Sequence, residues 1–84
     1  MPVIVRRAVL EGLVDPRFLG ELPKGVQAQV KRAVKEAGPG DYASIRLGYA
    51  AADVHTAVKA LQSKPRVSKK LAAVLPELAR IPGY

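Results

Sequence analysis

The chain has 84 residues, with 14 Lys and Arg against 7 Asp and Glu, which gives a formal net charge of +7 at pH 7. With 49% hydrophobic residues it can form one compact domain over residues 1–84, but it is too short to bury two cores. The charge excess predicts a polyanionic partner, which the composition leaves open as nucleic acid, an anionic membrane surface or an acidic protein patch.

The absence of certain residues excludes several classes of protein. The chain has no Cys, which excludes disulfides and thiolate metal sites and fits a cytoplasmic location. No apolar stretch approaches the roughly 20 residues of a membrane span, so we expect a soluble cytoplasmic protein, nucleoid-associated if it binds DNA. Seven prolines and the scarcity of Asn, Cys and Met are typical of proteins from hot environments, and a GC-rich genome gives a similar bias.

The first third of the chain is interrupted by prolines. Apolar residues recur on one helical stripe of residues 2–14, which favours a helix, while the β-branched start fits a short strand equally well. Asp15 followed by Pro16 is typical of a helix start, so we expect one or two turns over residues 16–21, ending before Pro23.

Residues 24–37 have the most regular pattern in the chain. Val26, Val30 and Val34 recur every four residues, and charged residues occupy the other side, as in an amphipathic helix. Gly38 follows as the predicted C-terminal residue that ends this helix.

The remaining segments also have helical patterns. We expect Asp41 to cap a helix through Leu47, and a second helix over residues 51–62 to follow the break at Gly48. Ser68 is the predicted cap of the last helix.

That last helix is expected from Lys69 to near Arg80, with residues 81–84 as a flexible tail. Four to five short helices without an alternating strand pattern predict an all-α bundle in one domain.

The helix–glycine–helix unit over residues 41–62 resembles the helix-turn-helix of nucleic-acid-binding proteins. The resemblance is carried by small residues in the first helix, an apolar residue before the turn, glycine in the turn and two inward valines: Ala43, Ser44, Leu47, Gly48, Val54 and Val58. It implies that residues 51–62 are the recognition helix.

On this alignment the outward positions of the second helix are Ala51, Ala52, His55, Thr56 and Lys59. The resemblance implies that His55 and Thr56 would hydrogen-bond base edges or phosphates, that Lys59 would neutralise a phosphate, and that the alanines would offer methyl contacts. Because such a set reads bases weakly, we expect affinity to exceed sequence specificity.

A second resemblance covers residues 41–78. The Leu47-Gly48-Tyr49 loop, followed by two helices, is similar to ubiquitin-associated-type three-helix domains, such as the C-terminal domain of the Holliday-junction protein RuvA. It implies docking of a protein through Gly48, Tyr49 and the end of the third helix.

The basic residues in the second half form an acid-free run. Between Val54 and Pro76 there are five of them and no Asp or Glu. Cations at the start of the last helix oppose the helix dipole, which suggests that they face an anion such as phosphate. The candidate nucleic-acid-binding set is therefore His55, Thr56, Lys59, Lys64, Arg66, Lys69 and Lys70.

The sequence does not favour catalysis or a bound cofactor. His55 is the only histidine and has no set of ligands at metal-binding spacing, and no catalytic group of residues has a supporting pattern. We expect no enzyme activity, metal, cofactor or small-molecule substrate. Tyr42 and Tyr49 are expected to pack at the edge of the core, with stacking on a base or sugar as the alternative.

The sequence therefore favours a small nucleic-acid-binding protein. We expect double-stranded DNA rather than RNA as the partner, and a transcriptional regulator or chromatin-type factor of modest specificity. Homodimerisation through residues 24–37 or 2–14 stays open. The alternatives are a protein-interaction module of ubiquitin-associated type and a structural subunit of a nucleoprotein particle, such as a ribosome or virion.

Overall fold

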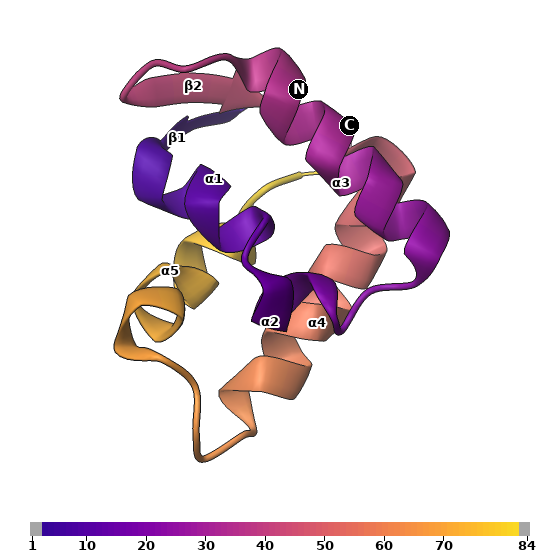
Figure 1. Ribbon diagram of the computed structural model, residues 1–84, viewed down its shortest axis with the longest axis vertical. Helices are drawn as coiled ribbons and strands as arrows, with labels where there is room; N and C mark the ends of the chain where they lie inside the picture. The colour runs from indigo at the N-terminus through magenta and orange to yellow at the C-terminus, as the bar shows by residue number, and fades with distance from the viewer. Residues whose placement is uncertain (1–2, 83–84) are drawn as a thin grey trace.

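The computed structural model describes residues 3–82, which form five α-helices and one two-stranded sheet (Figure 1). The elements in chain order are β1 (Val3–Arg6), α1 (Arg7–Leu13), α2 (Pro16–Leu19), α3 (Lys24–Ala37), β2 (Tyr42–Ile45), the 3-10 turn η1 (Gly48–Ala50), α4 (Ala51–Gln62) and α5 (Lys69–Leu78). Figure 1 shows the sheet at one end of the molecule, with α3 on one side of α1 and α5 on the other. The fold is mostly helical and not strictly all-α.

The helix predicted over residues 41–47 is wrong, because this segment forms strand β2. It pairs antiparallel with β1, with Val3 opposite Ile45 and Arg6 opposite Tyr42. Burial alternates along Tyr42–Ile45, exposed then buried, so one face packs on the core and the other faces solvent. The segment 41–62 that resembles a helix-turn-helix therefore contains one α-helix, α4, preceded by a strand and a short turn.

For residues 2–14 the sequence left a helix and a short strand open, and each is found in part of the segment. The β-branched start forms β1, and the chain then turns directly into α1 at Arg7. The Arg7 backbone N–H donates to the Asp41 carbonyl at 2.7 Å. Its guanidinium donates to the carbonyls of Gly38 and Gly40, with Nη2 at 2.5 Å from Gly38 and Nε at 2.8 Å from Gly40. One arginine thus holds the loop between α3 and β2 against the start of α1.

Four helices begin where the local residues predict. The Asp15 carboxylate accepts from the Arg17 N–H at 2.9 Å at the start of α2, and Ser68 Oγ accepts from the Leu71 N–H at 3.2 Å in the first turn of α5. The predicted bounds of α3 and α4 are confirmed, and Gly38 ends α3 with a φ of 86°.

The core lies between the sheet and the helices. Its largest fully buried side chain is Phe18 of α2, and α1 contributes Val9, Leu10 and Leu13. Helices α1 and α5 approach closely at Gly12, where an added Cβ would lie 2.8 Å from Val74 Cγ2. That distance is too short for two carbon atoms, so the contact requires a residue without a side chain.

The predicted flexible tail over residues 81–84 is wrong where the structure describes it. The Ile81 side chain is fully buried and belongs to the core. Pro82 is half-buried, and residues 83–84 lie outside the described residues. The polypeptide beyond α5 therefore returns to the core.

We expect Gly12→Ala to lower the free energy of unfolding by about 1–3 kcal/mol, because Val74 must move to admit the methyl group. Gly25→Ala is the matched control: this exposed glycine of α3 has nothing within 4 Å of an added Cβ, so the change should be neutral or stabilise by up to about 1 kcal/mol. Urea denaturation followed by far-UV circular dichroism measures both, and equal stability of the two variants would contradict the close α1–α5 contact.

Candidate nucleic-acid interface

The predicted reading positions of α4 are largely engaged within the protein. Ala51 was predicted to face outward, but it is buried. His55 is half-buried, and its Nε2 donates to the Ile81 carbonyl at 2.9 Å, since a carbonyl only accepts. Thr56 is exposed, but its hydroxyl donates to the Ala52 carbonyl one turn earlier at 3.0 Å. Lys59 is exposed and remains as the basic residue of this helix, so α4 offers little for reading bases.

Two lysines of the acid-free basic run form ion pairs with carboxylates from other parts of the chain. Lys64 Nζ lies 3.0 Å from Glu21 Oε2, and Lys70 Nζ lies 3.5 Å from Glu11 Oε2. Arg66 and Lys69 are exposed and make no ion pair with another residue in the range 3–82. The predicted set is therefore divided, because two of its five cations are offset by carboxylates that the local sequence does not show.

Helix α3 presents a larger group of cations on its solvent face, which we call the α3 stripe. Its members are Lys24, Lys31, Arg32 and Lys35. All four are exposed, while Val26, Val30 and Ala33 bury the opposite face.

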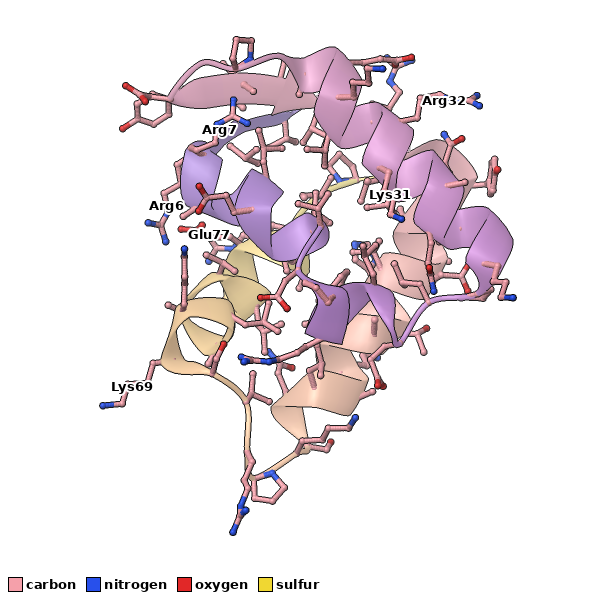
Figure 2. The ribbon with its side chains drawn as sticks, viewed as in Figure 1. Arg6, Arg7, Lys31, Arg32, Lys69 and Glu77 are labelled. Carbon is pink, nitrogen blue, oxygen red and sulfur yellow. The ribbon has the colours of Figure 1, made fainter. Side chains whose placement is uncertain are left out.

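The stripe is long and carries unbalanced charge. At 3.6 residues per turn, Lys31 and Lys35 lie about two and about three turns after Lys24, so the three share one side over about 17 Å. No ion pair or side-chain hydrogen bond to these cations occurs among residues 3–82, and Glu36, one turn after Arg32, is the acid of this helix. Figure 2 places Lys31 and Arg32 on α3, and Lys69 at the start of α5 on the other side of the view.

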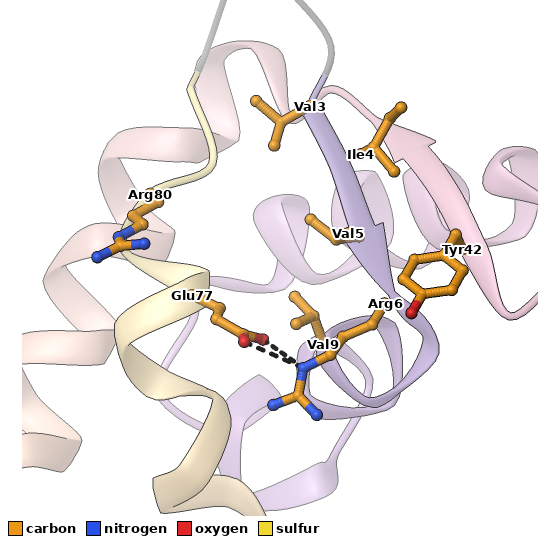
Figure 3. Close-up of a pocket in the computed structure, with 8 residues that line it drawn as sticks. All are labelled: Val3, Ile4, Val5, Arg6, Val9, Tyr42, Glu77 and Arg80. Atoms are coloured by element: carbon orange, nitrogen blue, oxygen red, sulfur yellow. Dashed lines mark hydrogen bonds and ion pairs between the residues drawn. The ribbon is translucent and has the colours of Figure 1, made fainter.

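A groove runs between β1 and α5, with a cavity volume of about 400 Å³ (Figure 3). Val3, Val5 and Val9 line its apolar part, and Tyr42 and Arg80 also border it. Glu77 is a lining residue as well.

Its carboxylate is engaged by an arginine of the strand. Both carboxylate oxygens of Glu77 accept from Arg6 Nε at 3.0 Å. The alternation of Tyr42, Ser44 and Arg46 is the sequence signal for the exposed sheet face beside this groove. That alternation is only a few residues long, and the same residues were predicted to form a helix, so the exposed sheet face was not found from the sequence.

Two other classes of feature, metal-binding clusters and membrane-spanning helices, are not found in residues 3–82. This part of the chain has no group of three or more His, Asp or Glu side chains placed to hold a metal ion. It also has no helix of the length and apolarity that crossing a membrane requires.

Comparison of the chain with protein-family models, curated proteins and solved structures gives no match. The geometry of the described residues is therefore the basis for a functional proposal.

We expect Ile81→Ala to lower the free energy of unfolding by about 2–5 kcal/mol, because it leaves a cavity in the core. His55→Ala should cost about 1 kcal/mol through loss of the bond to the Ile81 carbonyl. Thr56→Ala, on the exposed side of the same helix, is the control and should change stability by less than about 0.5 kcal/mol. Urea denaturation checks all three; wild-type stability of Ile81→Ala would show that residue 81 does not pack.

Proposed function

We propose that the protein binds nucleic acid by contacting backbone phosphates, with the α3 stripe as its main surface. Double-stranded DNA is the expected partner, and a small transcriptional regulator or chromatin-type factor is the expected role. The supporting observation is that four exposed cations, free of acid partners among residues 3–82, lie along one rigid helix of a chain with net charge +7.

A single helix face suits a phosphate backbone because its cations are held at fixed spacing. Each Lys or Arg that neutralises a phosphate releases condensed counterions, which makes binding strongly dependent on salt. Lysine and arginine contacts to phosphate carry no sequence information directly. Because His55 and Thr56 of α4 are engaged within the protein, we expect modest specificity.

The predicted cations in and after α4 have a smaller role in this proposal. Lys59, Arg66 and Lys69 are exposed and can add contacts, whereas Lys64 and Lys70 would first exchange Glu21 and Glu11 for phosphate. Exposed ion pairs contribute little, about 0–1 kcal/mol, so this exchange is not prohibitive.

A second candidate function is protein docking through the turn before α4. Tyr49 is 64% exposed in η1, directly after Gly48, whose φ is 59°. A large exposed side chain at a tight turn is the feature that docking of ubiquitin-associated type would use.

The α3 stripe can be tested against an equal loss of charge elsewhere. The triple variant Lys24→Gln, Lys31→Gln and Lys35→Gln lowers the net charge from +7 to +4, and so does the control Lys59→Gln, Arg66→Gln and Lys69→Gln. Glutamine preserves helix propensity. Fluorescence anisotropy with a labelled random duplex, over a series of salt concentrations, should show that the log–log slope falls by about 3 in the first variant and by less than 1 in the second.

The outcomes separate the surfaces and the function. Equal losses in the two variants would contradict a localised site and indicate diffuse attraction. A larger loss in the control would place the main contact on the cations in and after α4. Salt-insensitive or absent binding by the wild-type protein, together with capture of a protein that depends on Tyr49, would favour the docking function instead.

A further inference from the structure

The outer face of the sheet exposes two large side chains next to each other. Ile4 is 74% exposed and Tyr42 is 73% exposed, on adjacent strands. The register places Tyr42 directly opposite Arg6 and Ile4 opposite Ser44. Because directly paired residues of an antiparallel sheet project from the same face, an aromatic ring, an aliphatic side chain and a guanidinium group adjoin one another there.

The groove beside this face combines apolar surface with cations. Three valines, Val3, Val5 and Val9, line it, and Ile4 and Tyr42 border it on the sheet side (Figure 3). Arg80 lies at its α5 side and has no ion pair or hydrogen bond through its side chain among residues 3–82.

The acid of the groove does not repel an anion strongly. Glu77 is balanced by Arg6, which contacts it through Nε alone, so the terminal nitrogens of Arg6 keep donors for another group. The groove therefore has an apolar lining, one exposed ring and two guanidinium groups against one carboxylate. A ligand complementary to it has a flat apolar face and negative charge.

We propose that this groove binds an unpaired nucleotide of single-stranded nucleic acid, with the base stacked on Tyr42 and the flanking phosphates contacted by Arg6 and Arg80. The proposal goes beyond the proposed function and adds a second ligand class to it. The volume of about 400 Å³ lies within the range of small-ligand sites, about 300–1,000 Å³. Stacking on an aromatic side chain is tolerant of base identity, which agrees with modest specificity.

The charge decides between a nucleotide and an extended peptide. The free edge of a strand can accept a peptide by backbone hydrogen bonds, but that mode needs neither an exposed ring on the sheet face nor two arginines. A base within a duplex is stacked between its neighbours and presents no open face to Tyr42, so the ligand is unpaired nucleic acid.

The test compares a labelled oligothymidylate and an oligouridylate with a duplex of the same length by fluorescence anisotropy. Tyr42→Leu keeps an apolar side chain but removes the ring, and Tyr42→Phe keeps the ring. Tyr49→Leu removes the other exposed tyrosine of the described residues and is the matched control.

We expect Tyr42→Leu to weaken single-strand binding by about 5- to 100-fold, and Tyr42→Phe and Tyr49→Leu to leave it within about twofold. Duplex binding should be unchanged in all three variants. Arg80→Gln should lower the salt slope for the single strand by about 0.7 without changing stability. Far-UV circular dichroism checks that each variant is folded.

The results distinguish this proposal from the proposed function. Equal single-strand affinity of Tyr42→Leu and the wild type would overturn the groove, while duplex binding through the α3 stripe would stand. A protein that binds the single strand through Tyr42 but does not bind the duplex would confirm the groove and contradict the α3 stripe.

Discussion

The arrangement of this protein depends on the contacts that Arg7 makes with the loop after α3. Its backbone and side chain donate to three carbonyls, those of Gly38, Gly40 and Asp41, which would otherwise lack these partners where the helix ends. The β1–β2 register begins one residue away, at the Arg6–Tyr42 pair. Arg7 therefore ties the end of α3 to the start of α1 through its side chain, and ties the start of β2 to it through its backbone, so both proposed nucleic-acid surfaces adjoin these contacts.

Local sequence signals were sufficient for α2, α3, α4 and α5, but they left residues 2–14 open between helix and strand and were insufficient for β2. Asp15 and Ser68 mark helix starts because their side chains bond to backbone N–H groups two or three residues away, and the valine spacing of α3 spans its whole length. Strand β2 is only four residues long, too short for a period of two to be distinguished from a helical pattern. It is a strand because it pairs with β1, about 40 residues earlier, and such pairing is not encoded locally.

The candidate site also depends partly on local sequence and partly on long-range contacts. The sequence predicts the excess of positive charge, but Lys64 finds its carboxylate 43 residues away and His55 finds its carbonyl 26 residues away. These long-range contacts engage residues that the linear pattern leaves free. The cations of α3 can be read from the sequence. Only the fold shows that they have no such partners among residues 3–82, which leaves their charge unbalanced.

The close contact at Gly12 also has a geometric consequence for the groove between β1 and α5. This helix carries Glu77 and is followed by Arg80, and its distance from α1 is set by the absence of a side chain at position 12. Strand β1 is continuous with α1, so the same distance determines how widely the groove opens. A glycine in the core therefore helps to set the width of a groove on the surface, and a side chain at position 12 would be expected to change both.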